Sequence, residues 1–352
     1  MRSTLLAVVA AALAGCAAGE KSPDEKEWEA QMYLGEQMFK NSKFEDAVRA
    51  YRRAVQLKPD NYQATIGLGA SCSEASLTLY VEAERLLAVR QRDVAKRNID
   101  RADEYVLMAK KCFARGLEMR PNDRVANYNL GLMYYKRATT PYNLPYPSQL
   151  EPPDEVRRDA VALAKWMETY EARKVGVEAR RNERDEAISQ FLQVLKIEKV
   201  ALDAPTHVTH CASPQAHRYL ALALLTRGNW EGTENDTELA RRHLSVFLAW
   251  VLAVRQHIVE KAPNKSAEEK AQKEKELEFF DRELLDLKEI LLGWREGLNS
   301  LERQCRLNTE DCPVPREKRA ARLDAIAREM LIIEATIQQY EEARKPKLPK
   351  KP

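Results

Sequence analysis

Glycine is scarce in this chain, with 12 among 352 residues, and no glycine-rich loop of the kind that cradles phosphate groups is present. No Ser-His-Asp or Cys-His set stands in a recognisable catalytic context. Acidic residues abound, but they fall on the solvated faces of expected helices, and no two of them form a clear acid–base pair. The sequence therefore argues against an enzyme, and we expect no cofactor.

Long apolar runs are also missing. The stretches 5–13 and 246–254 are both too short to span a membrane as a helix. The net charge of +3 is too small to favour nucleic acid as a partner. The chain is instead 32% charged, with both signs interspersed, and this composition suits long amphipathic helices. We predict an all-α fold.

A spaced set of small and aromatic residues recurs along the chain. Its first copy consists of Leu34, Gly35, Ala47, Tyr51, Ala54 and Pro59. In such a pattern the small residues let two helices approach closely, the aromatic ring fills the gap beside them, and proline ends the second helix. This copy, over residues 28–61, resembles the tetratricopeptide repeat (TPR), a 34-residue pair of antiparallel helices.

Three further copies follow. Their residues are Leu68, Gly69, Ala109, Phe113 and Pro121 in the second, Leu130, Gly131, Tyr134, Ala187 and Phe191 in the third, and Leu220, Ala221, Ala240 and Phe247 in the degenerate fourth. Pro121 lies 62 residues after Pro59, which is 28 more than one repeat, and 28 residues are four heptads. Whole heptads lengthen both helices of a pair while keeping the same face inward. We predict a TPR-type α-solenoid over 28–260, with extended or inserted helices at about 73–108 and 135–182.

The TPR resemblance implies a groove that is lined by the first helix of each pair and binds other proteins. The positions that face this groove are occupied by Met32, Phe39, Ile66, Tyr128, Leu132 and Tyr135, and by Arg218, Leu222 and Leu225 in the fourth copy. These residues predict an apolar, aromatic groove for a helix or an extended segment. The alternative is an internal surface that the protein's own C-terminal hairpin fills.

The first residues have the pattern of a secretion signal, with Arg2, the apolar run 5–13 and the sequence Leu-Ala-Gly before Cys16. This pattern resembles the lipobox of bacterial lipoproteins, which implies cleavage before Cys16 and lipidation of Cys16. Ala17, in place of an aspartate, implies sorting to the outer membrane, facing the periplasm. Residues 1–15 are then the signal and 16–27 the lipidated tether, with a plain soluble-secretion signal as the alternative.

Two apolar seams predict an antiparallel helical hairpin over 266–343. They alternate spacings of three and four: Leu277, Phe280, Leu284, Leu287, Leu291, Trp294, Leu298 and Leu301, then Leu323, Ile326, Met330, Ile333, Ile337 and Tyr340. In an antiparallel hairpin the residue numbers of two facing residues always add up to the same value, because one helix runs up while the other runs down. A sum of 617 places Leu291 opposite Ile326 and Cys305 opposite Cys312. In an oxidising envelope we predict a disulfide between these two cysteines, with free thiols as the alternative.

Other cysteines and histidines leave their chemistry open. Cys72 and Cys112 lie on the two helices of the second pair, either bridged or as small core residues. A cluster between the third and fourth copies resembles a transition-metal ligand set and consists of His207, His210, Cys211 and His217. A polar loop is the simpler interpretation of that cluster, and we predict no metal site.

The irregular stretch 139–153 is held extended by its prolines. Tyr142 and Tyr146 within it are candidate anchors for a partner, and a packed surface strap is the alternative. The basic tail 344–352 is expected to be disordered.

As a whole the chain resembles the TPR lipoproteins that help assemble outer-membrane machines, such as pilotins of type IV pilus secretins and TPR members of the barrel-insertion complex. That resemblance implies a non-enzymatic scaffold, anchored by the lipid on Cys16, that recruits an envelope protein complex. Two alternatives stay open: an adaptor for peptidoglycan enzymes, and an envelope protein that binds a metal or a small molecule.

Overall fold

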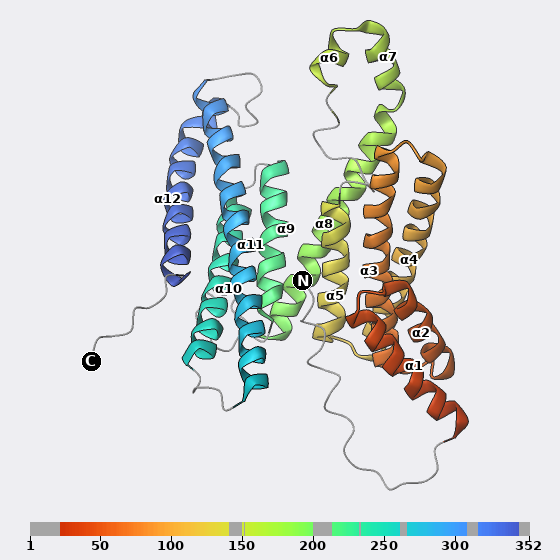
Figure 1. The fold of residues 1–352 in the computed structure, drawn as a ribbon. Coiled ribbons are helices and arrows are strands. Elements are labelled where there is room, and N and C mark those ends of the chain that lie inside the picture. The colour runs from red at the N-terminus through yellow and green to blue at the C-terminus, as the bar shows by residue number, and fades with distance from the viewer. Residues whose placement is uncertain are drawn as a thin grey trace, which may run out of the picture. The chain divides into compact units, whose positions relative to one another are not determined.

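The computed structural model of the chain describes residues 22–140, 150, 152–199, 213–231, 234–260, 266–307 and 316–344. These residues form twelve α-helices and no strand (Figure 1), which confirms the all-α prediction. The chain divides into two compact units, Met1–Lys199 and Val200–Pro352, which we call unit 1 and unit 2.

Unit 1 contains three antiparallel helix pairs and a helical insertion in the third pair. The pairs are α1 (Pro23–Lys40) with α2 (Phe44–Leu57), α3 (Tyr62–Ala88) with α4 (Arg92–Met119), and α5 (Arg124–Thr139) with α8 (Tyr170–Ile197); the insertion holds α6 (Asp154–Arg157) and α7 (Ala160–Glu168). The first helix of each pair begins at a side-chain cap, because Ser22, Asn61 and Asp123 each accept a hydrogen bond from a backbone amide of the first turn.

The second pair is longer than the first. Helices α3 and α4 have 27 and 28 residues, against 18 and 14 in α1 and α2. Buried Tyr80 and Ala83 on α3, with Ala95 and Ala102 on α4, continue the inward face into the added turns. This confirms the extended helices that the four-heptad spacing predicts.

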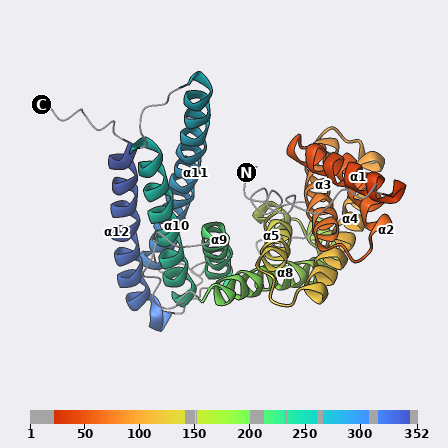
Figure 2. The same ribbon diagram turned by 90° about the horizontal axis from the view of Figure 1, so that it is seen from below.

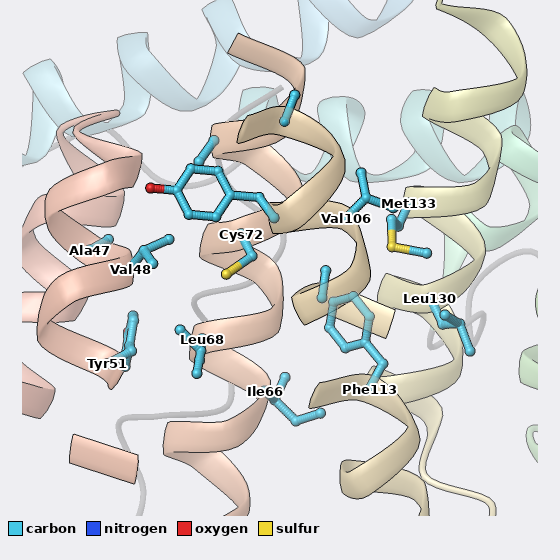
Figure 3. Packing of buried hydrophobic residues seen from close by; sticks show 14 of the residues in the cluster. Ala47, Val48, Tyr51, Ile66, Leu68, Cys72, Val106, Phe113, Leu130 and Met133 are labelled. Carbon is cyan, nitrogen blue, oxygen red and sulfur yellow. The ribbon is translucent and has the colours of Figure 1, made fainter. Parts of the chain in front are cut away.

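Close contacts between glycines and aromatic rings hold each pair of unit 1 together. A Cβ atom on Gly69 would lie 2.8 Å from the ring of Phe113, which is fully buried. The same arrangement recurs as Gly35 with Tyr51 and Gly131 with Phe191. Figure 3 shows Tyr51 and Phe113 within a continuous cluster of buried side chains that runs from α2 to α5. Because a glycine has no Cβ atom, the facing ring can pack directly against its backbone, which lets the two helices of each pair approach closely.

Unit 2 contains four long helices, and each packs against at least one other. They are α9 (Pro214–Glu231), α10 (Glu234–Glu260), α11 (Ala267–Arg306) and α12 (Arg319–Arg344), the last preceded by a short 3-10 helix (Arg316–Lys318). Helices α9 and α10 form the fourth pair, in which Leu220, Ala221, Ala240 and Phe247 are all fully buried. Trp250 of α10 meets Phe280 of α11 edge-on, with ring centroids 5.6 Å apart. The fourth pair thus shares a compact unit with α11 and α12, whereas the sequence grouped it with the solenoid over 28–260.

The hairpin of α11 and α12 is antiparallel, as predicted, but its predicted register is wrong. Lys288 pairs with Glu341 at 2.8 Å, although the predicted register places Lys288 opposite residue 329. Ile333 lines a small cavity together with Leu291 and Trp294. The reason lies at the turn, because α11 ends at Arg306 and α12 begins only at Arg319, a wider connection than the sequence suggested. The predicted register places Ile333 opposite Leu284, so its place beside Leu291 is a shift of one heptad, which keeps the apolar face inward.

The described cysteines are buried or partly buried. Cys72 and Cys112 are free thiols, and Cys72 has no exposed surface. Burial raises the pKa of Cys72 to about 12 and that of Cys112 to about 11, so both stay protonated and unreactive at neutral pH. Cys305 is buried near the end of α11, and Cys312 lies outside the described residues, so their disulfide stays a prediction.

Candidate protein-binding groove

The first helices of the three pairs of unit 1 lie side by side. Helix α3 packs against α1 on one side and α5 on the other. In Figure 2, α1, α3 and α5 lie along one side of unit 1, and α2, α4 and α8 along the other. All six predicted groove residues stand on α1, α3 and α5.

On α1, Met32 and Phe39 are partly buried and pack against the core of unit 1. Phe39 meets Phe44, the first residue of α2, edge-on with ring centroids 5.4 Å apart. Ile66 of α3 is buried, and its Cδ1 atom lies 2.5 Å from where a Cβ atom on Gly116 of α4 would stand. Ile66 therefore fills the gap left by this glycine inside the second pair, which corrects its predicted place on the groove surface.

Helix α5 contributes the remaining predicted residues. Tyr128 packs on Phe191 of α8, with ring centroids 6.0 Å apart, so part of its ring belongs to the third pair. Leu132 and Tyr135, further along α5, are partly exposed. The described helices of unit 1 that pack on α5 are α3, α4 and α8. The apolar surface available on this side is thus smaller than predicted and centres on α5.

The groove also carries charged side chains at positions that the repeat pattern assigns to it. Lys136 of α5 binds Glu74 of α3 at 2.5 Å, and both side chains are largely buried. Beside them a small, open recess has both polar and apolar walls, from Ser73, Ser76, Leu77, Tyr80, Met133, Lys136, Arg137 and Thr140. Arg137 is paired in turn with Glu183 at 3.2 Å. Because its cations already have carboxylate partners, the recess has mixed character and is no anion site.

A buried arginine fixes the end of α5. Arg180 of α8 is fully buried and donates hydrogen bonds to the backbone carbonyls of Ala138 and Thr140, the second at 2.9 Å. A cation at the carboxyl end of a helix is favoured by the helix dipole. Nothing in the sequence around Arg180 marks it, since its partners lie some 40 residues earlier. The clamp holds α5, and with it Leu132 and Tyr135, in place.

In unit 2, two side chains of the first turns of α9 are bound to α11. Arg218 of α9, a predicted groove residue, is 3% exposed and binds Glu283 of α11 at 2.5 Å and Asp286 at 3.4 Å. Gln215 also reaches Glu283, at 3.4 Å. At these two positions the alternative therefore holds, because the protein's own α11 binds the side chains.

The predicted metal ligand His217 is part of a different arrangement. It is buried, and its Nδ1 atom lies 2.7 Å from Nδ1 of His243 on α10. Burial lowers the pKa of His217 to about 4, and burial together with His217 lowers that of His243 to about 3. Among the described residues no three His, Cys, Asp or Glu side chains form a metal-binding group.

Several predicted sites lie outside the described residues. They are Cys16, Tyr142, Tyr146, His207, His210, Cys211 and Cys312. No helix in the part of the chain that the structure describes has the length and hydropathy of a membrane span.

One comparison with known proteins identifies the repeat. The profile of the tetratricopeptide repeat matches residues 28–61, which contain most of α1, all of α2 and the residues up to the start of α3. The chain contains a TPR. The contact between Gly35 and Tyr51 in this repeat has equivalents in the second pair, Gly69 with Phe113, and in the third, Gly131 with Phe191. Unit 1 therefore has a TPR-type solenoid architecture. No curated protein matches the chain.

TPR solenoids generally mediate contacts between proteins. A role in binding a protein partner therefore follows from the fold of the chain, and the face of α1, α3 and α5 is the candidate surface.

Proposed function

We propose that this protein is a non-enzymatic scaffold, anchored by lipid in the bacterial envelope, that recruits a protein complex through the α1–α3–α5 face of unit 1. The observation that carries the proposal is a contrast between α9, the first helix of the fourth pair, and α5, the first helix of the third pair. On α9, Arg218 is buried and bound to Glu283 of the protein's own α11, whereas Leu132 on α5 keeps part of its surface exposed.

The character of this face suits a peptide or helix ligand. Leu132 and Tyr135 offer apolar contact, and the Lys136–Glu74 pair beside them offers a donor and an acceptor of opposite charge. Tyrosine is one of the residue types that are enriched among those that dominate binding energy at protein interfaces. We infer a partner segment with one apolar anchor and polar flanks.

The lipid anchor rests on the sequence alone. The lipobox-like residues before Cys16 support lipidation at that cysteine, and Ala17 supports an outer-membrane location facing the periplasm. Lipid attachment would hold the solenoid at the membrane surface, so that partner binding also localises the partner.

Quantitative affinity purification from crosslinked cells tests the proposal. We compare the native protein with Leu132→Arg, and use Leu107→Arg as the matched control, because Leu107 is an exposed leucine on α4, outside the face. The proposal predicts that the recovered partner falls roughly tenfold with Leu132→Arg, as for loss of an interface anchor, and is unchanged with Leu107→Arg. Equal recovery from both variants would refute the role of this face.

A second comparison tests the anchor. Cys16→Ala should abolish incorporation of labelled palmitate and release the protein from the membrane fraction. Retention of label in this variant would contradict lipidation at Cys16.

A further inference from the structure

The long α3–α4 hairpin continues beyond its own core. The last buried residue of α3 is Ala83 and the first buried residue of α4 is Ala95. Between them the chain turns without burying any side chain. Leu87, Val89 and Val94 are respectively 46%, 64% and 36% exposed. We call the segment from Arg85 to Arg97 the hairpin tip; apart from buried Ala95 and partly buried Leu86, its apolar residues are exposed.

The hairpin tip is also strongly basic. It carries five bases and one acid, Asp93; the bases are Arg85, Arg90, Arg92, Lys96 and Arg97, all exposed. Arg85 makes a 3.7 Å contact with Glu82, one turn further from the apex. The other four bases form no ion pair with the described residues. The apolar apex is thus surrounded by more bases than acids, and most of these bases form no ion pair with the described residues.

The backbone holds this apex in a defined turn. The amide of Gln91 donates to the carbonyl of Leu86 at 2.8 Å, and the amide of Arg90 donates to that of Leu87 at 3.0 Å. This pair of bonds closes the carboxyl end of α3 and requires a left-handed residue, which here is Arg90 with φ of 63°. The turn is therefore fixed, and it presents Val89 and Arg90 together at the most distal point of the hairpin.

We propose that the hairpin tip is a membrane-contact site that inserts Leu87, Val89 and Val94 into the headgroup region of a bilayer and binds anionic phosphates through its arginines. Apolar side chains gain by leaving water at such an interface, and basic residues gain from its negative potential. Charge complementarity selects this occupant, because an anionic bilayer satisfies the apolar apex and the ring of cations at once. The contact is independent of lipidation at Cys16 and would orient unit 1 on the surface.

Vesicle sedimentation with the full chain tests this proposal. The Cys16→Ala background removes the lipid, and the tip variant Val89→Ser/Arg92→Glu is compared with Leu107→Ser/Lys111→Glu, which changes an exposed leucine and an exposed base elsewhere on α4. On vesicles containing phosphatidylglycerol we expect the tip variant to lose roughly tenfold or more in partition and the control to stay within about twofold. For the chain with the native tip sequence, the fraction bound to vesicles should fall when salt is added. It should also be lower on phosphatidylcholine vesicles than on those containing phosphatidylglycerol.

Amide hydrogen exchange tests the tip directly, because membrane binding through another part of the chain would not slow exchange of the amides at the tip. The amides of residues 92–94, in the first turn of α4, should slow on anionic vesicles and not on phosphatidylcholine, while those of residues 104–112 stay unchanged. Arg90→Gly should weaken partition about fivefold without lowering the thermal midpoint, because glycine prefers the left-handed turn. Unchanged exchange at the tip, or equal partition of the tip and control variants, would overturn the proposal and leave an acidic protein as the ligand of the tip.

Discussion

Mild acid should destabilise unit 2 through its buried histidine pair. His217 and His243 are buried and paired through their Nδ1 atoms, which requires at least one ring to be neutral. Their pKa values are lowered to about 4 and about 3, against 6.5 for an unfolded histidine. As the pH falls, the two histidines bind protons in the unfolded chain before they do so in the folded chain. The free energy of unfolding is therefore at its full value above about pH 6.5 and decreases as the pH falls.

The magnitude follows from linkage. At about pH 5 each ring is still neutral in the folded state, while the unfolded ring is almost fully protonated. Each histidine then lowers the free energy of unfolding by about 2 kcal/mol relative to pH 7, and the pair lowers it by about 4 kcal/mol. This result needs only that both folded pKa values lie below 5.

Urea unfolding followed by circular dichroism at about pH 7 and pH 5 measures this loss. The variant His217→Leu/His243→Leu should lose far less stability between the two pH values, and His257→Leu, at an exposed histidine of the same helix α10, should behave like the native chain. All five histidines lie in unit 2, so the effect should be confined to that unit. An equal acid loss in the native and double-variant chains would refute the reasoning.

Two further predictions concern unit 1. Gly69→Val should lower the free energy of unfolding by about 3 kcal/mol or more in urea titrations, because a Cβ atom would stand 2.8 Å from the ring of Phe113; stability within about 0.5 kcal/mol of the native chain would contradict the close approach of α3 and α4. Cys72, fully buried and with its pKa raised to about 12, should resist iodoacetamide in the native chain and react in urea, and rapid native labelling would show that this core opens.

The sequence predicted the parts of the fold that depend on local spacing. Glycine and aromatic residues in the order of the repeat identified three pairs of unit 1, although added residues separate the two helices of the third pair, α5 and α8. The four-heptad excess predicted the length of α3 and α4, because heptads conserve the buried face.

Features that depend on long-range placement escaped sequence reasoning. The seven-residue seam of α11 and α12 fits more than one register, and the Lys288–Glu341 pair shows which one is used. Arg180 reaches carbonyls on another helix, and His217 meets a histidine 26 residues away. The position of Ile66 in the repeat suggested the groove, but the glycine at 116 offered it space inside the pair.

Site-specific photocrosslinking in cells tests the central claim most directly. A photoreactive residue at Leu132, on the face of α5, is compared with one at the exposed Leu107 of α4. Our account predicts a discrete crosslinked product with another protein from position 132 and none from position 107. Crosslinks from position 132 only to the chain's own C-terminal helices, or the same products from both positions, would contradict it.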